Sequence, residues 1–259
     1  MKLRLAVLAA LCDSSASLRV PTATGRRKVL SLAGAAAFAG RGAAQPASAA
    51  DPSVKIYFGA GCFWHVQHEF TMEEMSTLKR TSSQITAISG YAGGQRLGDG
   101  GKVCYHNFKR FADYGQLGHA EAVQVEVPAS AIPAFSRKYF GLFGTRGYRH
   151  DPMDKGGEYR SVLGLPGGEN SVYYAEIQKA ASESPMTLFT GRGDEGDTIG
   201  DKSVLVYDSN KFPFYAGELY HQFHDDFMGP PYGKAYNAIN PTLYKAGVLK
   251  NTGCPDSPF

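Results

Sequence analysis

Cysteine is scarce in this 259-residue sequence, which holds four of them, and tryptophan occurs once. Cys12, Cys62, Cys104 and Cys254 form no CxxC pair and lack the spacing of a zinc site, so we expect no structural metal. Cys12 lies in a segment that we predict below to be a leader. Three cysteines then remain, and an odd number favours catalytic thiol chemistry over a disulfide framework.

A basic surplus is missing from most of the chain. The formal net charge of +3 comes from residues 1–49, which hold seven Lys or Arg and one acidic residue. Residues 50–259 therefore carry a net charge of −3. Proteins that bind nucleic acids usually show a basic footprint, so this role is not expected. With 43% hydrophobic and 20% charged residues and no internal repeat, the composition is that of a soluble globular protein without a membrane partner.

Residues 1–49 are predicted to be a targeting leader and residues 50–259 a single catalytic domain. The apolar run at the start is too short to span a membrane. Arg26-Arg27 precedes a weakly apolar, alanine-rich run, as in twin-arginine export signals, and Ala47-Ser48-Ala49 has the pattern that signal peptidases recognise. Two signals in series predict a plastid protein of the thylakoid lumen. Export to a bacterial periplasm is the simpler alternative, and a disordered tail is the third.

A reactive cysteine is predicted where a strand turns into a helix. Gly59-Ala60-Gly61 ends a short strand-like run, and apolar residues at helical spacing follow Cys62. Unpaired N–H groups at a helix start lower the pKa of a thiol, and the thiolate is the reactive form. The alternative is that Cys62 is merely a small buried hydrophobe. Because Phe63 and Trp64 are adjacent, they cannot both face the core, so at least one should line a cleft beside the sulfur.

The order of the predicted elements indicates an α+β fold, a two-layer sandwich with a mixed or antiparallel sheet. Further strands are expected at residues 84–91, 122–127 and 162–165, with two weaker ones within 186–207, and helices at 130–143, 169–182 and 217–226. Strand-helix-strand-strand-helix-strand order is that of the ferredoxin-like, split βαβ core. The remainder, from residue 228, is expected to be a long coil tail.

Polar residues beside the strands are further candidates for a site. Glu121 begins a strand that looks buried, and a lone buried carboxylate is costly unless it has a partner or a function. Burial would raise its pKa and let it donate a proton near neutral pH, whereas the alternative is an exposed acid at a strand end. His119 is either a base for Cys62 in a cysteine hydrolase or a capping side chain in a turn. Tyr159 and Arg160 belong either to the core or to its rim.

Together these motifs resemble those of the peptide methionine sulfoxide reductase A family, in the same order. They are Gly59–Trp64, Gly90–Gly94, Gly118–Glu121, Asp154–Ser161 and Phe214–Gln222. The resemblance covers residues 54–235. It implies a thiol-dependent oxidoreductase that reduces methionine S-sulfoxide, in oxidised proteins or free, and so repairs oxidative damage.

The resemblance also implies a role for each matching residue. Cys62 would attack the sulfoxide sulfur and become a sulfenic acid, while Glu121 protonates the oxygen. Phe63 and Trp64 would form the apolar pocket for the S-methyl group. Two tyrosines bind the oxygen in the family. Tyr159 matches the second, whereas Tyr105 fits the first best, with Tyr114 as the alternative. Asp154 matches the family's aspartate five positions before the second tyrosine.

No bound cofactor or metal is implied, but a thiol reductant is. In the family a resolving cysteine and then a thioredoxin-like protein clear the sulfenic acid. Residues 231–235 lack the cysteine usual there, which leaves Cys254, and then Cys104, as the resolving cysteine, or direct reduction by an external thiol. The sequence also has His65 where the family usually has glycine, and Gln67 where glutamate is common. We expect a monomer.

Two rival functions are retained at this point. One is a cysteine hydrolase that uses Cys62 and His119. In that case the imidazole must lie within hydrogen-bond reach of the thiol, and the Phe-Trp pair has no evident role. The other is an inactive peptide-binding module that keeps the aromatic pocket.

Overall fold

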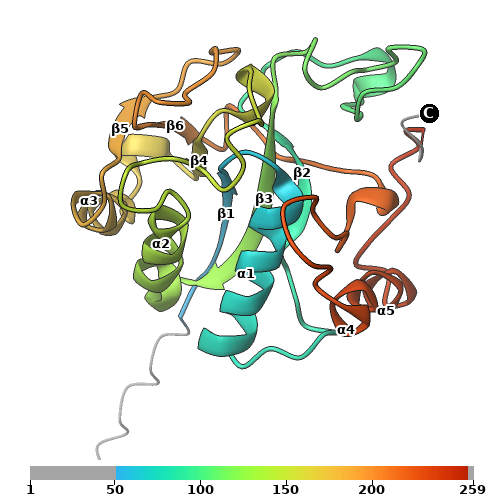
Figure 1. Cartoon of the computed structure of the whole chain (residues 1–259), viewed down its shortest axis with the longest axis horizontal. Coiled ribbons are helices and arrows are strands. Elements are labelled where there is room, and N and C mark those ends of the chain that lie inside the picture. The colour runs from blue at the N-terminus through green and yellow to red at the C-terminus, as the bar shows by residue number, and fades with distance from the viewer. Residues whose placement is uncertain (1–50, 256–259) are drawn as a thin grey trace, which may run out of the picture. The chain divides into compact units, whose positions relative to one another are not determined.

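The computed structural model describes residues 51–255 (Figure 1). The predicted leader, with Cys12, lies outside these residues, so its assignment stays a prediction. Within the described part of the chain, no helix has both the length and the apolar character needed to cross a bilayer.

One mixed sheet organises the described residues. Its strands are β1 (Ser53–Gly59), β2 (Ile88–Ala92), β3 (Ala120–Pro128), β4 (Val162–Leu165), β5 (Thr187–Thr190), β6 (Ser203–Asp208) and β7 (Tyr215–Ala216). They lie in the order β5-β6-β4-β1-β3-β2-β7. The central strands β4, β1, β3 and β2 pair antiparallel, β7 continues this pattern at one edge, and β6 and β5 add in parallel beyond β4. The expectation of a mixed α+β sheet is confirmed.

The helices complete the predicted core topology. They are α1 (Phe63–Thr77), α2 (Ile132–Gly141), α3 (Tyr174–Ser182), α4 (Lys234–Asn237) and α5 (Ile239–Lys245), with 3₁₀ turns at Asp99–Gly101, Ala129–Ala131, Gly157–Tyr159, Gly168–Asn170 and Leu219–His221. The order β1-α1-β2-β3-α2-β4, with β1 and β3 at the centre of the sheet, is the split βαβ arrangement. Figure 1 shows α1 and α2 side by side in front of the central strands, which makes two layers.

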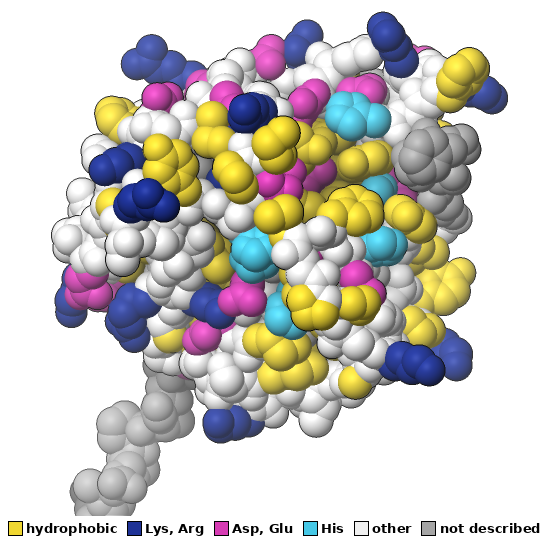
Figure 2. Space-filling model, in the orientation of Figure 1, with side chains coloured by type: hydrophobic (Ala, Val, Ile, Leu, Met, Phe, Trp, Pro, Cys, Tyr) yellow, Lys and Arg dark blue, Asp and Glu magenta, His cyan; other side chains and the backbone are white. Residues whose placement is uncertain are grey.

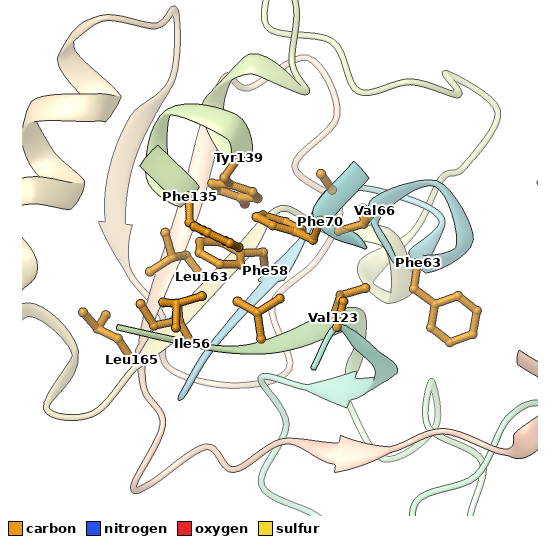
Figure 3. Packing of buried hydrophobic residues seen from close by; sticks show 14 of the residues in the cluster. Ile56, Phe58, Phe63, Val66, Phe70, Val123, Phe135, Tyr139, Leu163 and Leu165 are labelled. Atoms are coloured by element: carbon orange, nitrogen blue, oxygen red, sulfur yellow. The ribbon is translucent and has the colours of Figure 1, made fainter. Parts of the chain in front are cut away.

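Aromatic side chains fill the space between these layers. Phe58 of β1 stacks on Phe70 of α1 with ring centroids 4.5 Å apart, and Phe135 of α2 lies 6.0 Å beyond Phe70 (Figure 3). Each of these rings is fully buried, and burial of a large apolar side chain contributes about 1.5–3 kcal/mol. In the same view Phe63 points away from these three rings. Phe63, Trp64 and Val66 of the first turn of α1 are buried in the same cluster as Phe70, so the core fixes the start of the helix beside Cys62.

A buried tyrosine ties α2 to the end of β1. The Tyr139 hydroxyl lies 2.9 Å from the carbonyl oxygen of Gly59 and 3.0 Å from that of Val162. Because it has one proton to donate, the two carbonyls share it. Gly59 is the last residue of β1, three positions before Cys62. The contact therefore fixes the point at which the chain leaves the sheet for α1.

Two predictions for the last quarter of the chain were wrong. Residues 217–226 form a single 3₁₀ turn instead of a helix, since Phe223 has a φ of +56° and the Gln222 side chain binds backbone atoms of Ser89 and Gly217. The tail is not all coil, because α4 and α5 lie within it. Leu243 of α5 is buried, and the Asn240 side chain donates to two carbonyls of the preceding segment.

Candidate active site

Cys62 lies at the junction of β1 and α1, as the sequence predicts. It is the N-cap residue of α1, and its thiol is free. The preceding Gly61 has a φ of +79°, and a Cβ there would lie 3.0 Å from a carboxylate oxygen of Asp154. Only glycine takes both the conformation and the close approach without strain. The same Asp154 oxygen accepts the Cys62 N–H at 2.9 Å, so the loop before the Gly157–Tyr159 turn holds the cysteine backbone.

Glu121 projects from β3 into the same place and is 1% exposed, which excludes an exposed acid at a strand end. Its Oε2 accepts the Phe63 N–H at 2.8 Å, and its Oε1 accepts the Tyr114 hydroxyl at 3.2 Å. Burial raises the pKa of Glu121 to about 8. The negative charge of Asp154 adds to this rise, and the two hydrogen bonds oppose it. The carboxyl group is therefore mainly protonated at neutral pH and can donate its proton.

The Cys62 thiol does not have the low pKa that its place at a helix start predicts. Burial raises the pKa well above the ordinary value for cysteine, and the negative charge of Glu121 raises it further. Hydrogen bonds from the N–H groups of Trp64 and His65 lower the pKa of the thiol, but the net shift is upward. The expectation was wrong because local sequence does not reveal how deeply the thiol is covered. Protonation of Glu121 removes one cause of the rise, so the two groups are coupled.

Three tyrosines surround the Cys62–Glu121 pair in different ways. Burial, followed by the charge of Glu121, raises the pKa of both Tyr105 and Tyr159, and the charge of Cys62 also acts on each. Both hydroxyls therefore stay protonated and can donate. Tyr114 is fully buried and donates to Glu121 itself. This arrangement favours Tyr105 and Tyr159 as the two hydroxyl groups that act beside the sulfur, and Tyr114 as a residue that positions Glu121.

An aromatic hollow lies beside these groups. It has a volume of about 460 Å³ and is lined by Trp64, Tyr105, His106, Asn107, Phe108, Tyr220, His221 and Phe227. Figure 2 shows histidine side chains among hydrophobic and acidic ones on this face of the molecule. The Trp64 indole stacks on His224 with ring centroids 4.3 Å apart, and Phe227 meets it edge-on. Phe63 is 1% exposed and does not line the hollow; its ring supports that of His221 at 5.3 Å.

Arg160 and Glu218 hold the surrounding loops in place. The buried Arg160 guanidinium donates to carbonyl oxygens of Gly93 and Gly118, which join two of the sequence motifs, so this residue belongs to the core. One oxygen of Glu218 accepts the Tyr105 N–H at 2.8 Å, and the other accepts the Tyr91 hydroxyl at 2.6 Å. Glu218 lies in the Phe214–Gln222 motif, which is the signal that could have singled it out.

The other two cysteines of residues 51–255, Cys104 and Cys254, form a disulfide with their Cα atoms 5.6 Å apart. The expectation of unpaired thiols was therefore wrong, since a sequence separation of 150 residues conceals their proximity. The bond ties the C-terminal tail to the loop that carries Tyr105. In this state neither cysteine has a thiol, so a resolving role for Cys254 or Cys104 requires that the disulfide be opened first.

Cys254→Ser is expected to lower the free energy of unfolding by about 2–5 kcal/mol, because a cross-link that closes a long loop restricts the unfolded chain. Thermal unfolding of both proteins without reductant measures the difference. Cys104→Ser is the matched control, and the double variant should be no less stable than either single one. An unchanged melting temperature in Cys254→Ser, or additive losses in the double variant, would contradict a stabilising bond.

His119 does not have a nitrogen available for Cys62. Its Nδ1 accepts the Gly94 N–H at 3.3 Å, and its Nε2 lies 2.8 Å from the carbonyl oxygen of Arg96, to which it donates. Burial also lowers its pKa. The hydrolase alternative needs an imidazole with a free lone pair toward the thiol. The structure therefore does not favour it.

Comparison with known proteins decides the family. The family model for peptide methionine sulfoxide reductase matches residues 54–242. The chain belongs to this family. A relative named peptide methionine sulfoxide reductase MsrA from Geobacter sulfurreducens is 31% identical over 187 residues, which are 68% of this chain and 91% of the relative. Another of the same name, from Geobacter metallireducens, is 26% identical over 65% of this chain and 87% of its own length.

Among solved structures, methionine sulfoxide reductase A of Corynebacterium diphtheriae has 18% sequence identity and a TM-score of 0.41. The match covers 69% of this chain and 74% of that one. The sequence-based assignment to this family and to its enzyme class, a peptide methionine sulfoxide reductase, is confirmed by the family model and the relatives.

Proposed function

We propose that this reductase acts on the S epimer of methionine sulfoxide, in oxidised proteins or free, and returns it to methionine through a Cys62 sulfenic acid. The observation that carries the proposal is the buried carboxyl group of Glu121, mainly protonated at neutral pH, beside a free thiol at the start of α1. A sulfoxide oxygen must be protonated before it can leave sulfur, and a thiol is the nucleophile.

Substrate binding is assigned to the aromatic hollow and the adjoining hydroxyl groups. The S-methyl group would lie against the Trp64 indole, where an apolar wall replaces water. Tyr105 and Tyr159 would donate hydrogen bonds to the sulfoxide oxygen, because both keep their protons. Tyr220 and Phe227 also line the hollow, and its volume of about 460 Å³ leaves room for the neighbouring side chain of a peptide substrate.

The chemical step transfers an oxygen atom. Glu121 gives its proton to the sulfoxide oxygen while the sulfur of Cys62 attacks the sulfoxide sulfur. The thiol proton returns to the Glu121 carboxylate, and the oxygen ends on Cys62 as a sulfenic acid. The substrate sulfur gains two electrons and the cysteine sulfur loses two, so no cofactor is needed. Asp154 keeps the cysteine backbone fixed throughout this step.

Recycling is assigned to an external thiol, such as that of a thioredoxin-like protein. This thiol condenses with the sulfenic acid, releases water and leaves a mixed disulfide, which a second thiol reduces. The scheme leaves the Cys104–Cys254 bond intact. Repair of oxidised proteins by a monomer in the thylakoid lumen remains part of the proposal.

Separate assays of the two methionine sulfoxide epimers test the proposal. The full chain, freshly reduced and supplied with dithiothreitol, is expected to convert the S epimer to methionine and to leave the R epimer unchanged, as measured by chromatography. Binding of the S epimer without turnover would instead support an inactive binding module. Turnover of neither epimer by reduced, folded protein would overturn the proposed reaction.

A further inference from the structure

A second cluster of polar side chains lies next to Cys62 and has no part in the reaction proposed above. His65 comes from the first turn of α1, His150 from the loop after α2, and Asp226 from the segment before α4. The two imidazole rings stack with centroids 3.8 Å apart and an angle of 7° between their planes. His65 Nδ1 and His150 Nε2 each lie 3.6 Å from the same oxygen, Oδ2 of Asp226.

These N···O distances fit metal ligands better than hydrogen-bond partners, but the parallel rings direct their in-plane lone pairs past one another, so one ring must turn for both to meet one ion. A separation of 3.6 Å is too long for a hydrogen bond between nitrogen and oxygen. Ligand atoms that each lie about 2.0–2.2 Å from a tetrahedral Zn²⁺ are separated from one another by about 3.3–3.6 Å. All three atoms of the cluster lie within 4.8 Å of one another. Imidazole nitrogen and carboxylate oxygen are, in addition, a donor set that Zn²⁺ and its neighbours in the first transition row accept.

The carboxylate is held in place by its neighbours, as ligands of a metal usually are. Asp226 Oδ2 accepts the hydroxyl of Tyr232, which also lies 3.4 Å from His65 Nδ1. Asp226 Oδ1 accepts the Met228 N–H at 3.1 Å. The side chains of Asp226 and His65 are 6% and 14% exposed, so both are largely withdrawn from solvent.

A small cavity connects this cluster with Cys62. Its volume is about 30 Å³, enough for one water molecule or one ion, and Cys62, His65, His150 and Asp226 are among the residues that line it. The thiol already lies beside the backbone N–H groups of Trp64 and His65. Cys62 Sγ is not one of the atoms that lie within 4.8 Å of one another, so its side chain must turn into the cavity to supply the fourth position of a bound metal.

We propose that His65, His150 and Asp226 form a binding site for a divalent transition-metal ion of the Zn²⁺ type, with the Cys62 thiolate as fourth ligand. On binding, a metal–sulfur bond replaces the S–H bond, the proton passes to solvent, and no oxidation state changes. The bound ion occupies the lone pair with which Cys62 attacks sulfur. Metal binding therefore blocks reduction reversibly, a consequence that rests on the proposed function, whereas the site itself does not.

Titration calorimetry of the full chain with Zn²⁺, without thiol reductant, tests the site. A Cys12→Ser background removes the cysteine that lies outside the described residues. We expect one ion per chain, and affinity at least about tenfold weaker in His65→Gly and in His150→Ala, because each removes a ligand. His106→Ala is the matched control and should bind as the parent does. Equal affinity in parent, His65→Gly and His150→Ala would overturn the site.

The sulfur ligand has its own test with Co²⁺, whose absorption reports its ligands. The parent is expected to show a thiolate-to-cobalt charge-transfer band that Cys62→Ser lacks, while weaker visible bands remain from the two histidines. Loss of all binding in Cys62→Ser, together with unaltered binding in both histidine variants, indicates an isolated thiol and overturns the cluster as a site. Absence of the charge-transfer band in the parent overturns the fourth ligand.

The functional consequence is measured in a single turnover of pre-reduced protein. Zn²⁺ is expected to suppress the methionine burst of the parent at least tenfold and a chelator to restore it, while the ratio of bursts with and without Zn²⁺ approaches one in His65→Gly. A burst that saturating Zn²⁺ leaves unchanged would overturn inhibition. No burst even without metal would point to failure of the proposed function, and the titrations would still decide the site.

Discussion

Cys62→Ser is expected to reduce sulfoxide reduction more than about a thousandfold, because the serine hydroxyl has neither the nucleophilicity of sulfur nor a base to activate it. His119, the imidazole that could otherwise serve, has both ring nitrogens engaged with backbone groups. Stability should change little, since Cys62 makes its hydrogen bond to Asp154 through its backbone N–H, which serine keeps.

A single turnover with one equivalent of the S epimer measures this loss without any recycling step. Mass spectrometry after trapping with dimedone, which labels sulfenic acids, should find the adduct on the peptide that contains Cys62 in the parent and on no peptide in Cys62→Ser. Cys12→Ser, which also replaces one cysteine by serine, is the control and should give the parental burst. An adduct on another cysteine, or a burst in Cys62→Ser, would remove Cys62 from its proposed role.

The fold could be predicted from sequence where the signal is local. Alternating residues in β3 and the apolar spacing of α1 are properties of short segments, and their order along the chain is enough to indicate the split βαβ core. The segment at 217–226 misled because its apolar spacing resembles that of a helix. Its Gln222 side chain instead binds backbone atoms of Ser89 in β2, and side chains of Gln67 and Asn240 bind its own backbone.

The candidate site, like the fold, could be predicted from the sequence only where the signal is local. Cys62 and Glu121 were predicted as candidates because a helix start and a buried strand end are visible in the sequence. The direction in which the pKa of the Cys62 thiol shifts was not predicted correctly, since it depends on the burial that other segments provide. Likewise, His65, His150 and Asp226 are each unremarkable alone, and only the fold brings them within 4.8 Å of one another.

Glu121→Gln is expected to lower the reduction rate by about 10²–10⁴-fold, the usual contribution of a general acid. Glutamine fits the same space, and its carbonyl oxygen can still accept the Phe63 N–H, but it has no proton to give at neutral pH. Single-turnover rates between pH 6 and about 10 measure the effect. The parent should lose activity as pH rises through about 8, where Glu121 ionises, and the variant should lack this decline.

The same substitution is expected to stabilise the protein, which separates catalysis from folding. The pKa of Glu121 rises from 4.5 to about 8 on folding, so between these values the folded state holds a proton that the unfolded state has released. Stability of the parent therefore falls as pH rises through this range, by up to about 4 kcal/mol, and glutamine removes that loss. Thermal unfolding at pH 5 and pH 8 should show a gap in favour of Glu121→Gln that widens at pH 8.

Tyr114→Phe is the matched control for both the rate and the stability measurements. It removes a hydrogen bond that lowers the pKa of Glu121, so the decline in rate should shift to higher pH while the acid itself remains. A decline that stays near pH 8 in Glu121→Gln would assign it to a group other than Glu121. Parental rates in Glu121→Gln at pH 7 would exclude Glu121 as the proton donor, and a catalytic loss accompanied by destabilisation at pH 8 would make its role structural.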